Sequence, residues 1–157
     1  MIDFARLLGA LVDRDVRFVV VGGVAATLHG SARLTSDLDV VYDRSRENLE
    51  RIEKALEPLV PYLRGAPPGL PFRFDADTIQ RGLNFTLITT AGPIDFLGEM
   101  AGVGNYAAVA PRSDEVTLFG FRCRCIQLDA LIAAKRAAGR PKDLEVVAEL
   151  ESLRDLS

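Results

Sequence analysis

The segment from Phe18 to Tyr42, FVVVGGVAATLHGSARLTSDLDVVY, constrains the fold of this chain more than any other part of it. Two apolar runs suited to buried strands are joined by a glycine pair, a short Ala-rich stretch and a turn. The second run carries Asp37 and Asp39, and residues two apart in a strand point to the same face. Two adjacent carboxylates are unfavourable unless a cation or a proton lies between them. The segment therefore predicts strands around a metal site.

Length and composition indicate one globular domain covering residues 1–157. Hydrophobic residues make up 48% of the 157 residues and charged residues 26%, which excludes a disordered chain. The net charge of −3 gives the chain no overall basic character, so any binding of nucleic acid would depend on a local basic patch. No apolar run approaches the ~20 residues that cross a bilayer, and the N-terminus does not resemble a secretory signal. We therefore expect a cytoplasmic protein with no membrane partner.

The pattern along the chain predicts the α/β (α+β) class, with a central mixed β-sheet flanked by helices and a helical C-terminus. The segment from Arg64 to Phe74 is rich in proline and glycine and predicts a loop. We predict helices over 3–16, 24–28, 46–59, 77–81, 127–138 and 141–153. We predict strands over 17–21, 37–42, 84–89, 93–97, 107–109, 115–118 and 121–126.

A third acid, Asp95, lies within the apolar strand PIDFL, where burial without a partner would be costly. It needs a cation or hydrogen-bond donors, and an arginine such as Arg73 or Arg81 is the alternative partner. Three carboxylates suit a hard divalent cation. Two Mg²⁺ ions about 3.5–4 Å apart, or Mn²⁺ in their place, would activate an attacking hydroxyl and neutralise a leaving pyrophosphate.

These residues resemble the DNA polymerase beta-like nucleotidyltransferases, which have a Gly-Gly or Gly-Ser pair, then D-x-D, then a later strand acid. The text GGVAATLHGSARLTSDLDVV is most similar to the small bacterial branch, which includes abortive-infection and toxin–antitoxin enzymes and lincosamide nucleotidyltransferases. The C-terminal text is similar to the K-x-x-x-x-R and R-x-K-D elements of the toxin-like branch, through Lys135, Arg140, Lys142 and Asp143. Residues 47–84 match no part of the family pattern.

The resemblance implies transfer of a nucleoside monophosphate from a nucleoside triphosphate to an acceptor hydroxyl or phosphate. It implies metal ligation by Asp37, Asp39 and Asp95, with Asp95 also a candidate general base. The implied nucleotide-binding residues are Gly22, Gly23, Arg33 and Lys135, where the glycines cradle phosphate and Lys135 neutralises its charge. The acceptor stays open among tRNA, protein and a small molecule, and a cognate toxin or antitoxin is an implied partner.

Two other functions remain open. The chain could keep the fold and act without chemistry, as a module that binds or neutralises a partner protein. It could also be a phosphodiesterase or nuclease that uses the same two-metal mechanism to hydrolyse nucleic acid. We expect structural roles for His29 and Thr35, and buried free thiols at Cys123 and Cys125.

Overall fold

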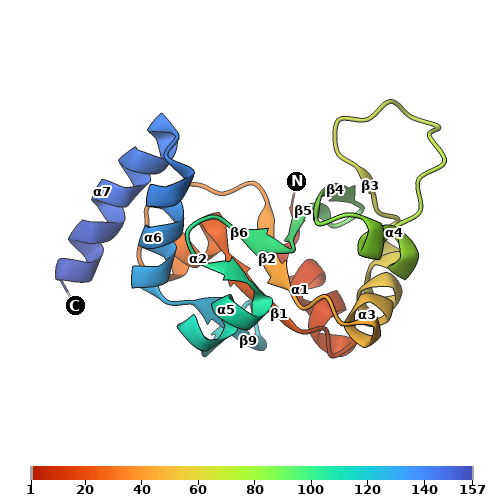
Figure 1. Ribbon diagram of the computed structural model, residues 1–157, viewed down its shortest axis with the longest axis horizontal. Helices are drawn as coiled ribbons and strands as arrows, with labels where there is room; N and C mark the ends of the chain where they lie inside the picture. The colour runs from red at the N-terminus through yellow and green to blue at the C-terminus, as the bar shows by residue number, and fades with distance from the viewer. Residues whose placement is uncertain (1, 157) are drawn as a thin grey trace.

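A mixed β-sheet runs through the middle of the structure, a computed structural model that describes residues 2–156 (Figure 1). Within those residues, seven strands form the sheet in the order β3–β4–β5–β2–β1–β9–β8. The strands are β1 Phe18–Val21, β2 Leu38–Tyr42, β3 Tyr62–Leu63, β4 Asn84–Thr89, β5 Gly92–Leu97, β8 Ser113–Leu118 and β9 Phe121–Ile126. A separate small hairpin joins β6 Glu99–Met100 to β7 Gly104–Asn105.

Helices flank this sheet, as the sequence predicts. In the described chain they are α1 Phe4–Asp13, α2 Gly22–Leu28, α3 Arg46–Leu56, α4 Ala76–Arg81, α5 Tyr106–Val109, α6 Leu128–Ala138 and α7 Pro141–Asp155. Short 3₁₀ turns follow α3 and α5, at Glu57–Leu59 and Ala110–Arg112. Helix α1 packs on β5 and β9, whereas α2 and α5 pack on β1 and β2. Helices α6 and α7 pair at one end of the molecule (blue in Figure 1).

The centre of the sheet brings sequence-distant strands together. Strand β2 pairs antiparallel with β1 and parallel with β5, and β1 pairs parallel with β9. Val20 and Val40 are paired and fully buried, as is Phe96, which lies opposite Val40 on β5. Side chains alternate along a strand, so the neighbouring residues Asp39 and Asp95 point to the other face.

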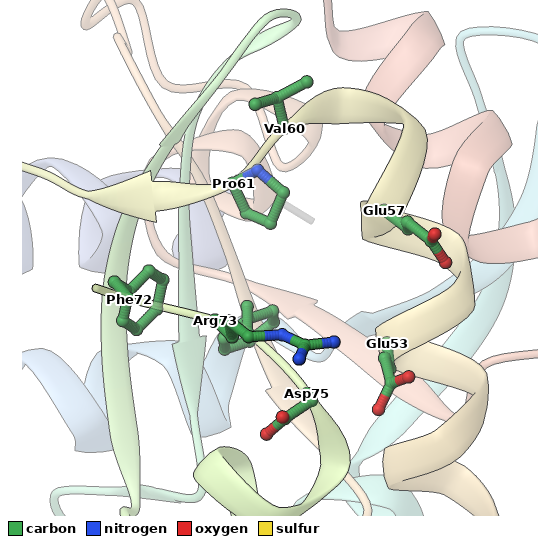
Figure 2. Close-up of a pocket in the computed structure, with 8 residues that line it drawn as sticks. Glu53, Glu57, Val60, Pro61, Phe72, Arg73 and Asp75 are labelled. Atoms are coloured by element: carbon green, nitrogen blue, oxygen red, sulfur yellow. The ribbon is translucent and has the colours of Figure 1, made fainter. Parts of the chain in front are cut away.

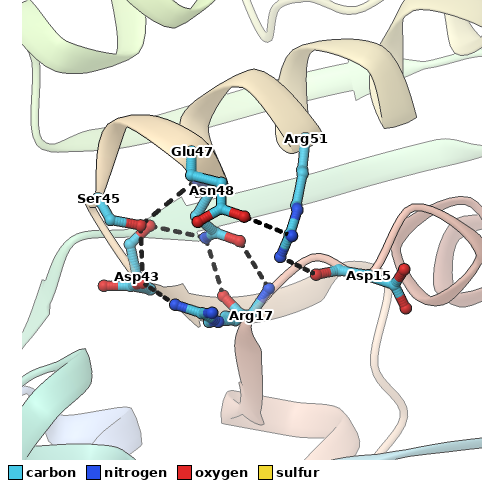
Figure 3. Close-up of polar contacts among 7 residues, drawn as sticks. All are labelled: Asp15, Arg17, Asp43, Ser45, Glu47, Asn48 and Arg51. Atoms are coloured by element: carbon cyan, nitrogen blue, oxygen red, sulfur yellow. Dashed lines mark hydrogen bonds and ion pairs between the residues drawn. The ribbon is translucent and has the colours of Figure 1, made fainter.

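A buried asparagine fixes α3 to the ends of β1 and β2 (Figure 3). Asn48 is 1% exposed; its Oδ1 accepts from the Arg17 amide at 2.7 Å, and its Nδ2 donates to the Arg17 and Asp43 carbonyls at 3.1 and 2.7 Å. Its side-chain polar atoms are therefore paired, which removes the usual cost of burying an amide. Ser45 caps the same helix by accepting from the Asn48 amide.

Most predicted elements are confirmed, and the exceptions are short. The predicted strand 107–109 is wrong: Tyr106–Val109 is the helix α5, because Asn105 caps it by accepting from the Ala108 amide. The sequence does not predict strands β3, β6 and β7, since two residues carry too little periodicity. Helix α2 begins at Gly22, two residues earlier than predicted.

The predicted loop 64–74 projects from the body of the molecule beyond β3 (yellow-green in Figure 1). Within residues 2–156, no helix combines the length and apolarity that crossing a membrane requires.

Candidate functional site

Three carboxylates meet where β2 and β5 run side by side. Asp39 and Asp95 are directly paired in the parallel register, and Asp37 immediately precedes β2. One oxygen from each of the three acids lies within 4.8 Å of the others. The structure therefore brings together the three acids that the sequence singles out.

All three acids are half-buried, and Asp39 has one carboxylate oxygen that is fully buried. This oxygen, Oδ1, has no hydrogen-bond partner among the described residues, although it is shielded from solvent. Burial, and then the charges of Asp37 and Asp95, raise the pKa of Asp39 to about 8. Burial and the charge of Asp95 also raise the pKa of Asp37. A buried carboxylate oxygen without a donor, beside two further acids, fits a metal ligand.

The glycine pair makes room for these acids. Gly22 has φ +66°, and a Cβ placed there would lie 2.1 Å from Asp39 Oδ2. A Cβ on Gly23 would lie 2.5 Å from Thr35 Oγ1, which itself donates to the Asp37 carbonyl at 3.1 Å. Thr35 thus has the structural contact that we expect. The phosphate-cradle role of the glycines stays a prediction from the resemblance.

A cavity of about 250 Å³ opens next to Asp39 and Gly22. The predicted nucleotide-binding residue Lys135 lines it from α6, and Arg140 and Asp143 line it from the start of α7. The positive charge of Lys135 favours ionised Asp39 and so lowers the pKa of Asp39, which partly opposes the effect of burial. The cavity therefore places Lys135 and Arg140 next to Asp39, in a lining that also contains Glu99 and Asp143.

Asp143 holds the two cations of this cavity in place. It is 1% exposed and accepts from Arg140 Nε at 2.5 Å, while Lys135 Nζ lies 3.6 Å from its Oδ1. The hydrogen bond from Arg140 lowers the pKa of Asp143. The K-x-x-x-x-R and R-x-K-D elements thus form one cluster of charged side chains, Lys135, Arg140 and Asp143, at the turn between α6 and α7. Lys142 is exposed next to this cluster.

Arg64 is a site residue that the sequence does not predict. Its Nη2 lies 2.7 Å from Asp95 Oδ1 and its Nη1 lies 3.7 Å from Asp37 Oδ2. The partner of Asp95 is therefore Arg64, and not the suggested Arg73 or Arg81. Arg64 lies at the start of the proline-rich loop, which matches no family pattern, so no local signal marks it.

Other predicted residues lie away from the acids or have structural contacts. Arg33 forms ion pairs with Glu145 and Glu149 of α7, at 4.0 and 3.6 Å. Its assignment to nucleotide stays a prediction. His29 lies at the end of α2, and its Nε2 is 2.7 Å from the Ile126 carbonyl oxygen. This contact matches the expected packing role.

The two cysteines are buried free thiols, as expected. Burial raises the pKa of Cys123 to about 11 and that of Cys125 to about 12. Both thiols are therefore protonated near neutral pH and poorly nucleophilic.

Known proteins resemble this chain in structure but not in sequence family. No protein-family model matches the chain, and no curated protein matches it by sequence. The structure of ANT(2")-Ia in complex with adenylyl-2"-tobramycin is similar with a TM-score of 0.57 and 18% identity, covering 96% of this chain and 92% of that one. The lincosamide antibiotic adenylyltransferase LnuA, bound to lincomycin, gives a TM-score of 0.61 and 15% identity over 97% and 98%. The Thermotoga maritima protein TM1012, a putative nucleotidyltransferase, is similar with a TM-score of 0.54 and 18% identity, covering 99% of this chain and 94% of that one.

Proposed function

We propose that this chain, which has the nucleotidyltransferase fold, transfers a nucleoside monophosphate from a nucleoside triphosphate to an acceptor. The observation that carries the proposal is the cluster of Asp37, Asp39 and Asp95 around an unpartnered, buried Asp39 oxygen. Such a cluster is costly for folding, because each carboxylate opposes ionisation of the others. A site that holds a cation for chemistry accounts for that cost.

The three acids would hold Mg²⁺ or Mn²⁺ through carboxylate oxygens, which are ligands that hard cations prefer. Such an ion supplies Lewis acidity at phosphate oxygens and neutralises the leaving pyrophosphate. The cavity beside Asp39 would take the triphosphate, where Lys135 and Arg140 offset its charge. Asp95 lies next to Arg64 and outside the lining of this cavity, and it would accept the proton of the acceptor hydroxyl.

We place the acceptor against the open part of β4. Thr86 is paired with Asp95, and Asn84, Thr86 and Ile88 alternate along the strand as exposed residues. This surface adjoins the acid cluster, and in the described part of the chain no helix packs closely on β4. We favour a small-molecule acceptor over tRNA or protein, because two of the similar structures hold an antibiotic or an adenylylated antibiotic.

Labelled nucleotides test the proposal. The protein is incubated with each α-labelled nucleoside triphosphate and Mg²⁺, together with one of three acceptor sets: aminoglycosides and lincosamides, total tRNA, or cell protein. We expect pyrophosphate release and transfer of label to the small-molecule set. Label on tRNA or protein would redirect the acceptor and favour the toxin–antitoxin setting that the resemblance implies.

Substitution of the acids separates catalysis from binding. Asp37→Asn and Asp39→Asn are each expected to lower transfer by more than roughly 100-fold, since even indirect partners of a metal contribute 10- to 100-fold. Asp77→Asn is the matched control, because Asp77 is an exposed residue of α4 paired with Arg46. No transfer to any acceptor, or full transfer by both acid variants, would overturn the proposal. The first result would favour a non-catalytic binding module, and hydrolysis of nucleic acid would favour a nuclease.

A further inference from the structure

Arg64 occupies the side of the acid cluster where a cation is needed. Its guanidinium reaches from the end of β3 across β4 to β5, donating from Nε and Nη2 to the Leu87 carbonyl at 3.2 and 2.7 Å. The same Nη2 donates to Asp95 Oδ1 at 2.7 Å, and Nη1 lies 3.7 Å from Asp37 Oδ2. One side chain therefore bridges two of the three proposed metal ligands.

This bridge pairs a positive charge with two of the acids that the proposed metal site uses. The Arg64 guanidinium lies within ion-pair distance of both Asp37 and Asp95, so its positive charge offsets part of theirs. It leaves Asp39 Oδ1 without a partner, so the guanidinium neutralises the outer part of the cluster and not its buried part. A metal ion bound through Asp95 Oδ1 and Asp37 Oδ2 would share or replace the Arg64 contacts, and an ion bound through the other oxygens would still lie close to the guanidinium charge.

We propose that Arg64 competes with the divalent ion for Asp37 and Asp95, holding the two carboxylates together until the metal displaces it. The inference rests on the metal site of the proposed function and adds a step that precedes chemistry. Arg64 therefore lowers metal affinity in the free protein, while protecting the fold from the repulsion among three acids.

The main chain at Arg64 is held in place independently of the guanidinium, so the side chain can move away from Asp37 and Asp95 while the backbone stays paired. The Arg64 amide donates to the Thr86 carbonyl at 3.0 Å, which anchors the main chain independently of the guanidinium. Gly65 follows with φ +82°, and a Cβ there would meet no atom within 4 Å. The far end of the loop is fixed by Phe72 and Phe74, which pack on each other and on further aromatic rings.

Binding of Mn²⁺ measured by electron paramagnetic resonance tests the competition, without nucleotide or acceptor. We expect Arg64→Gln to bind Mn²⁺ roughly tenfold more tightly than the wild type, because a charge-assisted pair no longer has to be broken and a nearby positive charge is lost. Arg64→Lys should give an intermediate affinity, because an ammonium keeps the charge but cannot make the same forked contacts.

Arg73→Gln is the matched control for loss of one charge from the same loop. Arg73 lies beside Glu53, Glu57 and Asp75 in a separate cavity of about 300 Å³ on the α3 side of the loop (Figure 2). We expect its Mn²⁺ affinity to equal that of the wild type. Equal tightening in Arg73→Gln and Arg64→Gln would show a general charge effect and would overturn the proposed competition.

The remaining outcomes separate this inference from the proposed function. If the wild type and Arg64→Gln bind Mn²⁺ equally, or the variant binds more weakly, the competition is wrong and the metal site stands. If neither protein binds Mn²⁺, the metal site fails and the competition fails with it.

A second measurement uses the unmodified protein and does not depend on the stability of the glutamine variant. The Arg64 Nε–H signal, identified in nuclear magnetic resonance spectra by its absence from Arg64→Lys, should shift and exchange faster with water as Mg²⁺ is added. An unchanged signal at saturating Mg²⁺ would contradict displacement.

Discussion

Gly22 lies against the carboxylate of Asp39 so closely that a single added carbon would collide with it. A Cβ at Gly22 would lie 2.1 Å from Asp39 Oδ2, far inside van der Waals contact. The glycine thus shapes the acid cluster by the absence of a side chain, and also adopts a φ of +66° that other residues rarely adopt.

Gly22→Ala is expected to push Asp39 out of the cluster. The collision is with a buried carboxylate that cannot turn freely, so Mn²⁺ affinity should fall by roughly tenfold or more. Left-handed strain adds about 1–2 kcal/mol of destabilisation. Mn²⁺ titration and urea denaturation measure the two effects separately.

Gly120→Ala is the control for the strain alone. Gly120 has φ +87° in the turn between β8 and β9, and a Cβ there meets no atom within 4 Å. This variant should lose stability and keep Mn²⁺ affinity. An equal loss of affinity in both variants would contradict the contact with Asp39 as the cause.

The raised pKa of Asp39 predicts how stability depends on pH without metal. The folded state holds a proton up to about pH 8, whereas the unfolded state releases it near the ordinary value of 3.8. Stability in EDTA should therefore fall as the pH rises through this window. Asp39→Asn should flatten the dependence, and chemical denaturation at several pH values measures both proteins.

Mg²⁺ should reverse that trend, because the ion binds the ionised carboxylates and its stabilising effect grows as protons leave. Parallel pH profiles for the wild type and Asp39→Asn in EDTA would contradict a raised pKa at this residue.

Asn48→Ala is expected to destabilise the fold by about 2–3 kcal/mol, because it removes three hydrogen bonds that a buried amide makes with backbone groups of Arg17 and Asp43. Asn105→Ala provides the comparison, since Asn105 makes an exposed cap contact with Ala108 and should cost about 1 kcal/mol. Urea denaturation monitored by circular dichroism gives both values. A smaller loss for Asn48→Ala than for Asn105→Ala would contradict the role of Asn48 in fixing α3.

Cys123 and Cys125 should react with a thiol reagent only after the structure opens. Cys123 is 6% exposed and Cys125 is 2% exposed, and their pKa values of about 11 and about 12 leave little thiolate at neutral pH. We expect labelling near neutral pH to be roughly 100-fold slower in buffer than in denaturing urea. Rapid labelling of either thiol in buffer would show that its strand is exposed.

Local patterns in the sequence anticipate much of the site. The alternation of side chains along a strand places Asp37 and Asp39 on one face, and the cost of burying Asp95 in an apolar strand marks it as needing a partner. The same reasoning cannot identify Arg64, because its neighbours Gly65 to Phe74 have no periodicity and its contacts are with strands more than twenty residues away.

The sequence by itself determined the class of the fold, the order of its longer elements and the three acids, since each depends on the period of apolar residues or on the local cost of a charge. The tertiary structure alone decided that β2 lies next to β5, which pairs Asp39 with Asp95, and that the end of β3 brings Arg64 to both Asp37 and Asp95. It also decided that Gly22 gives Asp39 its space. These relationships depend on strand order and on the packing of distant segments, which no local period encodes.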